Sequence, residues 1–206
     1  MQTLRRATLL LGAALFVAGC ASTTLRNAWF DPSYAGGPMR KILVVGVGAN
    51  LTDRRVFEDI FAQKLTAAGT QGLPGYQFLA DDARTSEPGW NAGVLASGAD
   101  GLLVVRVLGV DTKTRVSTTM VPAYGGMYFG PYGGIWGPQM VAIPDVSQYE
   151  VANVETTLFD VRSRRVVWAG TTETFNPTTV TKETPGFAEL IIGQLAARGL
   201  VAAPKT

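Results

Sequence analysis

Cys20 is the residue of this sequence most suited to covalent chemistry, because it carries the only thiol among 206 residues. The sequence has no histidine, which excludes Ser-His-Asp and Cys-His catalytic groups and removes the commonest metal ligand in proteins. A lone thiol in such a chain is better explained as a point of modification than as a catalytic nucleophile. The position of Cys20, directly after an apolar leader, supports that interpretation.

The leader before Cys20 has the order of charged and apolar residues found in secretory signals. Arg5 and Arg6 form a short positive segment, and an uncharged apolar run follows from Ala7 to Ala18. A membrane-spanning helix needs about 20 apolar residues, whereas the apolar part of a signal needs only ~7–15. We therefore predict that residues 1–19 are a signal peptide that is removed from the mature protein.

The four residues Val17-Ala18-Gly19-Cys20 resemble the lipobox of bacterial lipoproteins. The resemblance implies that the Cys20 thiol receives a diacylglyceryl group and that the chain is cut between Gly19 and Cys20. The amine freed by this cleavage would then be acylated, with palmitate as the expected fatty acid. Two or more acyl chains hold a protein stably on a bilayer. An ordinary signal peptide that ends near a cysteine, or an uncleaved anchor, is the alternative.

The residue after the cysteine bears on the choice of membrane. By resemblance to Gram-negative lipoproteins, Ala21 in place of Asp lacks the inner-membrane retention signal. We therefore expect a lipid anchor in the outer membrane, with the protein facing the periplasm. In a Gram-positive host, the same lipid would hold the protein on the outer face of the cell membrane.

The charge balance argues against two classes of partner. Lys and Arg number 18 against 16 Asp and Glu, and Arg5 and Arg6 of the signal account for the difference. The neutral mature chain has no basic run, which argues against nucleic acid and against electrostatic attachment to anionic lipid. We expect residues 20–39 to be the lipidated N-terminus and a tether, and residues 40–203 to form a single α/β domain.

Apolar periodicity in the domain predicts five strands and three helices in the order β-α-β-α-β-β-β-α. Alternating strands and helices imply parallel crossovers, and the closing hairpin implies antiparallel pairing, so we expect a mixed sheet with helices packed on it. Thr52 or Asp53 is expected to cap the first helix, and Thr184 the last, with Pro185 at its first position. The expected strands are 42–47, 76–80, 102–116, 149–160 and 165–175, and the expected helices are 53–68, 88–97 and 184–198.

Four segments carry a further resemblance, namely Trp29–Tyr34, Lys41–Val47, Arg54–Asp59 and Val167–Glu173. They resemble a family of uncharacterised bacterial lipoproteins of Gram-negative type and unknown function, over most of the mature chain. The element order is also similar to that of the TolB N-terminal domain and of the periplasmic domain of the curli secretion lipoprotein. The second likeness concerns architecture alone, which does not give function.

Two patterns typical of ligand sites are incomplete. Gly46-Val47-Gly48 lies between a strand and a helix, as a dinucleotide-binding loop does, but Leu51 stands where the third glycine belongs. The Lys-Ser/Thr pair of a phosphate-binding loop is also absent. Asp81 and Asp82 are adjacent acids without the spacing of a calcium loop. We therefore expect no cofactor, no metal site and no catalytic residue, and hence no enzyme.

Arg54 and Arg55 are unusual because they fall in the first turn of a predicted helix, where the helix dipole disfavours cations. An anion held by the helix N-terminus and these guanidinium groups would explain them. The alternative is ion pairing on a solvated face with Asp53, Glu58 or Asp59. Both interpretations stay open at this stage, with Arg54 and Arg55 as candidate anion contacts.

Residues 116–148 are expected to form a protruding loop between the third and fourth strands. Met120–Met140 contains six glycines and three prolines, and no charged residue occurs from Val116 to Pro144. Aromatic side chains on a pliable backbone suit partner contact, whereas a mobile low-complexity loop is the alternative. Glycines and prolines interrupt every run long enough for a membrane-spanning strand. The candidate contact residues are Tyr124, Tyr128, Phe129, Tyr132 and Trp136.

These observations favour a lipid-anchored envelope protein that acts as a non-enzymatic binding or assembly accessory. Its expected partners are the membrane, through the lipid on Cys20, and another envelope protein or further copies of itself. The alternative is a self-assembling structural or pore-associated outer-membrane lipoprotein. The sequence does not identify the partner.

Overall fold

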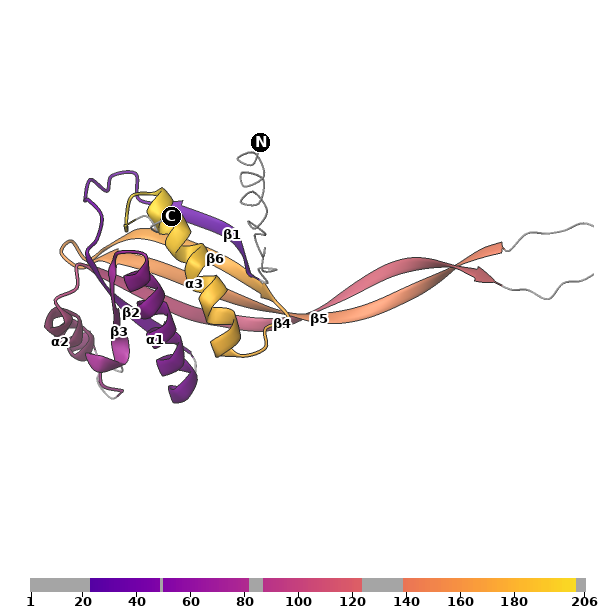
Figure 1. Cartoon of the computed structure of the whole chain (residues 1–206), viewed down its shortest axis with the longest axis horizontal. Coiled ribbons are helices and arrows are strands. Elements are labelled where there is room, and N and C mark those ends of the chain that lie inside the picture. The colour runs from indigo at the N-terminus through magenta and orange to yellow at the C-terminus, as the bar shows by residue number, and fades with distance from the viewer. Residues whose placement is uncertain (1–22, 49, 82–86, 124–138, 203–206) are drawn as a thin grey trace, which may run out of the picture.

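The structure, a computed structural model, describes residues 23–48, 50–81, 87–123 and 139–202. They form an α/β domain from which a long two-stranded arm projects (Figure 1). Within these ranges, no helix is both long and apolar enough to cross a membrane. The elements are β1 (Thr23–Phe30), β2 (Lys41–Val47), α1 (Leu51–Ala67), β3 (Gln71–Pro74), the 3₁₀ helix η1 (Gly75–Gln77), α2 (Glu87–Ser97), β4 (Gly101–Ala123), β5 (Gln139–Asp160), β6 (Arg165–Phe175) and α3 (Val180–Ala197).

A six-stranded sheet organises the domain in the order β1-β6-β5-β4-β2-β3. β2 pairs in parallel with β3 and β4, and the other neighbouring strands pair antiparallel. α1 and α3 cover one face of the sheet, and α2 packs on the other face beside β2 (Figure 1). The predicted mixed sheet with packed helices is therefore confirmed, and the predicted closing hairpin is that of β5 and β6.

β2 is the predicted central strand, and its side chains enter the two hydrophobic cores that lie on opposite faces of the sheet. Ile42 and Val44 face α1 and α3, whereas Leu43 and Val45 face α2, and all four are fully buried. A run that is apolar on both faces is what a strand between two helical layers requires. On the face of α1 and α3, the largest helical contributions to the core come from Phe61, Leu65, Phe187, Ile191 and Leu195.

A buried carboxylate fixes α1 against the sheet. Glu58 is fully buried; its Oε1 accepts a hydrogen bond from the Gly46 N–H (3.0 Å), and its Oε2 accepts one from the Tyr76 N–H (2.7 Å). One side chain thereby joins α1 to the end of β2 and to η1. Gly75 is required beside it, because a Cβ at that position would lie 2.7 Å from the Val44 carbonyl oxygen.

The largest departure from the sequence prediction lies before residue 40. The prediction assigns residues 20–39 to a tether, but β1 forms within this range and pairs with β6 as the edge of the sheet. The hydroxyls of Thr23 and Thr174 lie 2.9 Å apart, and Arg26 forms an ion pair with Glu173. An edge strand tolerates polar side chains on its exposed face, so β1 lacks the apolar run that marks a central strand.

The region after α1 differs from the prediction because of the same carboxylate. The strand predicted at 76–80 is found at 71–74 as β3. The Tyr76 N–H is directed to Glu58, and the chain turns there into η1 instead of continuing extended. The predicted cap of α1 was also wrong, since Asn50 is the capping residue and its side chain accepts from the Asp53 N–H.

The last helix begins earlier than the position of its proline suggests. α3 starts at Val180, so that Pro185 lies inside the helix and Thr184 is not its cap. Glu183 Oε1 accepts hydrogen bonds from the N–H (3.2 Å) and the hydroxyl (2.9 Å) of Thr178. This contact at the N-terminus stabilises a first turn that the sequence prediction leaves out.

Replacing Glu58 by leucine is expected to lower the free energy of unfolding by about 3 kcal/mol, because it leaves two buried N–H donors without their acceptor. Urea denaturation of Glu58→Leu beside the wild type measures the change. Glu189→Gln is the matched control, since Glu189 is exposed and pairs at the surface with Lys64, where such pairs contribute little. Equal losses in the two variants would show that the buried contact has no special role.

Candidate functional site

The most prominent feature of the molecule is the arm, which we define as residues 111–123 of β4 and 139–150 of β5. β6 pairs with β5 only from Val151 onward, and β2 pairs with β4 only as far as Arg106. In the described part of the chain, the two arm strands therefore pair only with each other from Thr112 to Ala123. At roughly 3.3 Å per residue, the arm is about 40 Å long, and it leaves the domain at one end of the sheet (Figure 1).

The arm exposes apolar side chains to solvent on both of its faces. On one face, Val116 lies opposite Val146, and these side chains are 67% and 60% exposed, with Met120 further along at 59%. Ile143 is exposed on the other face. A two-stranded ribbon is marginally stable in water by itself, and its open edges can accept further strands. The arm is therefore a surface suited to a partner.

The sequence prediction placed a loop at 116–148, and the structure corrects its extent. Residues up to Ala123 and from Gln139 onward are paired strand, in a regular antiparallel register. The candidate contact residues Tyr124, Tyr128, Phe129, Tyr132 and Trp136 lie outside the described residues. Gly19 and Cys20, the predicted cleavage and lipidation positions, also lie outside them. These assignments stay predictions.

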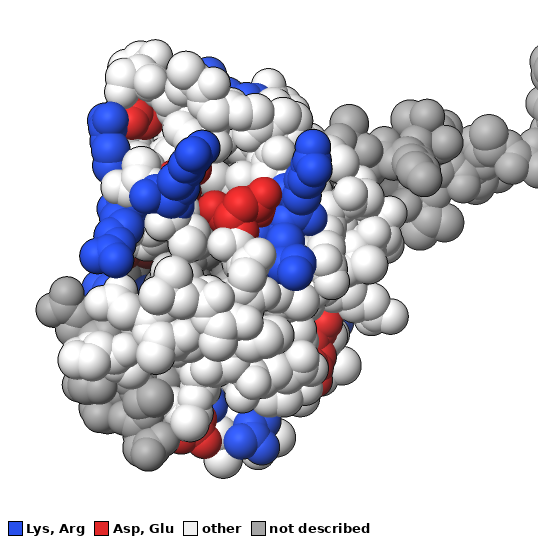
Figure 2. All heavy atoms as spheres, turned by 90° about the vertical axis from the view of Figure 1, so that its left-hand side faces the viewer, with Lys and Arg blue, Asp and Glu red and all other residues white. Residues whose placement is uncertain are grey.

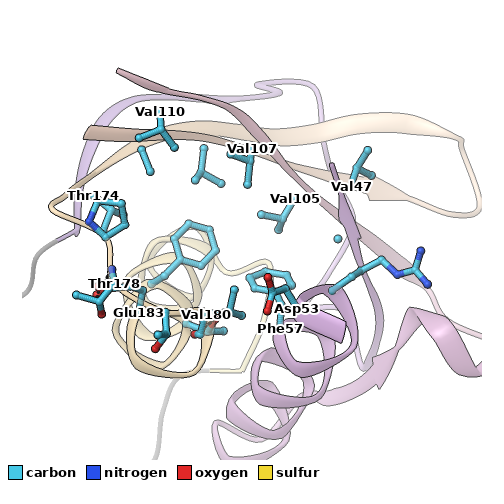
Figure 3. A pocket seen from close by; sticks show the side chains of 18 of the residues that line it. Val47, Asp53, Phe57, Val105, Val107, Val110, Thr174, Thr178, Val180 and Glu183 are labelled. Atoms are coloured by element: carbon cyan, nitrogen blue, oxygen red, sulfur yellow. Dashed lines mark hydrogen bonds between the residues drawn. The ribbon is translucent and has the colours of Figure 1, made fainter. Parts of the chain in front are cut away.

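A pocket of about 520 Å³ lies at the root of the arm, on the face of the sheet that carries α1 and α3 (Figure 3). Its floor consists of valines and small residues of β4 and β5, and its walls are the first turns of α1 and α3. A register shift between Val107 and Gly109 turns both Val107 and Val110 toward the pocket. The apolar lining consists of Val47, Phe57, Val105, Val107, Val110, Ala152, Val154, Pro177, Val180 and Phe187.

Three carboxylates lie around this pocket, and two of them serve helix ends. Asp53 accepts from the Asn50 side-chain amide (2.6 Å) at the start of α1, and Glu183 accepts from Thr178 at the start of α3. Glu150, at the root of the arm, is exposed. The same sign of charge thus recurs around an apolar floor. Within the described residues, no cluster of three or more Asp, Glu, Cys or His side chains is arranged to hold a metal ion.

The structure brings Arg54 and Arg55 together with a carboxylate that the sequence analysis did not associate with them. Asp81 pairs with the guanidinium of Arg54 and lies 3.6 Å from that of Arg55. Arg54 Nε also lies 3.9 Å from Glu58, one of the partners named in the ion-pair alternative, and the Arg55 guanidinium lies 5.5 Å from the centre of the Tyr76 ring. Asp81 comes after η1 in the chain, so only the tertiary fold shows this proximity. Anion binding by the two arginines stays a prediction.

The glycine pattern between β2 and α1 has a packing explanation. A Cβ at Gly46 would lie 3.2 Å from Arg54 Cγ and 3.4 Å from the Phe57 ring, so that α1 packs closely over the end of β2. Gly48 adopts a φ of 92°, which favours glycine at the exit from the strand. Both glycines are accounted for by the course of the chain, and no dinucleotide is needed to explain them.

The end of the molecule opposite the arm carries charges of both signs (Figure 2). The β5–β6 turn contributes exposed arginines, including Arg162 and Arg164. Asp31 accepts bonds from the hydroxyl and the N–H of Ser33, which together with the nearby Arg165 guanidinium (2.9 Å) hold the pKa of its carboxyl below the usual value. This carboxylate anchors the chain between β1 and β2 and balances part of the positive charge of this end.

Comparison with known proteins places the chain near no established family. No protein-family model matches it, and no curated protein sequence is significantly similar to it. Among solved structures, it is similar to two dodecamers of PelC from Paraburkholderia phytofirmans, with 16% and 19% identity and TM-scores of 0.45 and 0.42; each likeness covers 87% of this chain and 99% of the other. It is also similar to the lipoprotein GNA1162 from Neisseria meningitidis, with 14% identity over 76% of this chain and 98% of the other and a TM-score of 0.40. Likenesses this distant give no argument about function.

Replacing Asp81 by asparagine tests the anion contact. Asp81→Asn is expected to bind inorganic phosphate at least tenfold more tightly than the wild type, because a competing carboxylate is removed from Arg54 and Arg55. Titration calorimetry measures both affinities. Asp59→Asn is the control, since the Asp59 carboxylate accepts from the Tyr76 hydroxyl (2.9 Å). Equal affinities for Asp81→Asn and the wild type, or no heat in either, would remove the anion contact.

Proposed function

We propose that this chain is a lipid-anchored protein of the cell envelope that acts, without catalysis, as a binding or assembly accessory. The observation that carries the proposal is the arm, a ribbon with exposed apolar side chains and no charged residue from Val116 to Pro144. Surfaces of this kind mark contact sites in folded proteins. The predicted aromatic segment follows directly from Ala123, at the far end of the arm.

The position of the predicted anchor agrees with this role. Thr23, the first residue of β1, pairs with Thr174, and the neighbouring Phe175 pairs with Val151 at the root of the arm. Cys20 precedes Thr23 by three residues, and an extended chain covers at most about 11 Å over that length. A lipid on Cys20 would therefore keep the bilayer close to the end of the domain from which the arm leaves. We propose that this bilayer is the outer membrane and that the domain lies in the periplasm.

The energetics favour burial of the arm in a complex. Full burial of a valine, isoleucine or methionine side chain contributes about 1.5–3 kcal/mol, and Val116, Met120, Ile143 and Val146 are all exposed. A partner strand along either edge would add backbone hydrogen bonds. Because no charged residue lies between Val116 and Pro144, burial of this part of the arm carries no cost of ion desolvation.

A non-enzymatic role agrees with the chemistry of the pocket. The sequence has no histidine, and two of the three pocket carboxylates accept hydrogen bonds at helix ends. Arg54, the basic side chain of the lining, is paired with Asp81. These groups serve the fold and need no reaction to explain them.

A second candidate function is self-assembly into a structural or pore-associated complex in the outer membrane. The distribution of charge at the root of the arm favours it. On one face of the arm, the β4 strand carries Lys113 and Arg115 after Asp111, whereas the β5 strand carries Asp145. If copies stand side by side with the β4 edge of one against the β5 edge of the next, charges of opposite sign meet along the shared edge.

Introducing charge on the apolar face of the arm tests the main proposal. Val116→Lys combined with Val146→Lys is expected to abolish partner capture in crosslinked pull-downs from living cells while leaving the fold unchanged, because both side chains are exposed in the free protein. Thr114→Lys combined with Gln148→Lys is the control, since this polar pair lies on the same face, one repeat nearer the root. Capture that persists in the valine variant would exclude the arm as the contact element.

The mass of the lipidated protein in mild detergent separates the two candidate functions. Self-assembly predicts a discrete ring-like oligomer that dissociates in the Val116→Lys, Val146→Lys variant, since its arms carry like charges against each other. An accessory that binds a different protein predicts a monomer whose mass is the same in both forms. An oligomer unaffected by the arm substitutions would contradict the role of the arm in self-assembly.

A further inference from the structure

The pocket at the root of the arm has a largely apolar lining. Phe57 and Phe187 line it on the side of the helices, and Val105, Val107 and Val154 line it on the side of the sheet. Figure 3 shows the labelled valines of the two sides directed into one space. Its volume of about 520 Å³ lies within the ~300–1,000 Å³ of ordinary ligand pockets. An extended hydrocarbon matches this lining better than a polar metabolite does.

The first described residue of the chain lies directly beside the pocket. Thr174 lines it, and the Thr174 hydroxyl lies 2.9 Å from that of Thr23. Cys20 stands three residues before Thr23, within about 11 Å along an extended chain. A group attached to Cys20 therefore starts within reach of the pocket without any rearrangement of the domain.

The charges around the pocket select among apolar ligands. Asp53, Glu150 and Glu183 surround the lining, and the guanidinium of Arg54 is paired with Asp81. Carboxylates of this kind repel the head of a free fatty acid. An acyl chain held through an ester or amide carries no such charge. The lining thus favours a chain that is already bonded to a neutral carrier.

We propose that the pocket holds one acyl chain of the lipid on Cys20. The grounds are the apolar lining, the short distance from Cys20 to the pocket, and the carboxylates that disfavour a free fatty acid. This inference rests on the lipid anchor of the proposed function. The chain enters beside Thr174 and lies along Val154, Val107 and Val105 between the two helices. The remaining acyl chains stay in the bilayer, so that the protein is attached to the membrane and also holds its own lipid, which orients the root of the arm toward the membrane surface.

The register shift in β4 supplies a matched pair of variants. Val110 and Leu108 lie in one strand and are almost equally exposed, at 55% and 54%, but Val110 lines the pocket and Leu108 does not. Val110→Trp would fill the pocket entrance, whereas Leu108→Trp adds similar bulk elsewhere. Circular dichroism confirms that both variants fold.

Photocrosslinking from the lipid tests the proposal in the full chain. Cells are grown with a palmitic acid analogue that carries a diazirine at the end of its chain, membranes are irradiated, and crosslinked peptides of the purified protein are identified by mass spectrometry. The expected product joins the lipopeptide that begins at Cys20 to the pocket segments around Val105–Val110 or Val151–Val154. Its yield should fall at least fivefold in Val110→Trp and stay at the wild-type level in Leu108→Trp.

Three outcomes would overturn the inference. In the first, the lipopeptide carries its acyl chains but crosslinks to bilayer lipid alone. In the second, the pocket crosslinks to palmitate analogue that is not joined to Cys20. In the third, Val110→Trp gives the same yield of pocket crosslink as the wild type. The mass of the lipopeptide, measured in the same sample, separates these failures from failure of the proposed function. A bare Cys20 removes the anchor itself, whereas a lipidated Cys20 without pocket crosslinks removes the inference alone.

Discussion

The fold depends on one buried carboxylate, that of Glu58. Glu58 receives the N–H groups of Gly46 and Tyr76, so that a helix, the exit of the central strand and a 3₁₀ turn meet at one side chain. A buried carboxylate is costly unless its oxygens are satisfied, which makes this arrangement demanding in its geometry. It sets the N-terminal half of α1 across β2, and this part of α1 supplies Asp53 and Phe57 to the pocket. The shape of the pocket therefore follows from a contact outside it.

Those parts of the fold that rest on local apolar patterns could be predicted from the sequence. The run Ile42–Val45 marks β2 because both of its faces are covered, and the hairpin of β5 and β6 follows from two adjacent strand-like segments. β1 lacks such a pattern, because its stability comes from β6, far later in the chain. The distal arm is a similar case. Ser117, Thr118 and Thr119 suit strands and loops alike, and only their continuous register with β5 shows that this stretch is strand.

The candidate site was predictable only where single residues stand out. Arg54 and Arg55 are visible in the sequence as cations in a first helical turn, but their carboxylate partner Asp81 reaches them through the chain that follows η1. The pocket has no local signature at all, because its lining comes from β2, β4, β5, β6 and two helices. In the sequence, the valines of β4 indicate only a strand. The register shift after Val107 is what directs Val110 into the pocket together with Val107.

The way in which β5 is held has a mechanical consequence. This strand runs without interruption from the arm into the domain, where it is bonded to β4 on one side and to β6 on the other, from Val151 to Asp160. A pull along the arm is therefore parallel to these strands and is shared by all their hydrogen bonds at once, instead of opening them one after another. The joint between the arm and the domain is therefore suited to bear tension that acts along the arm.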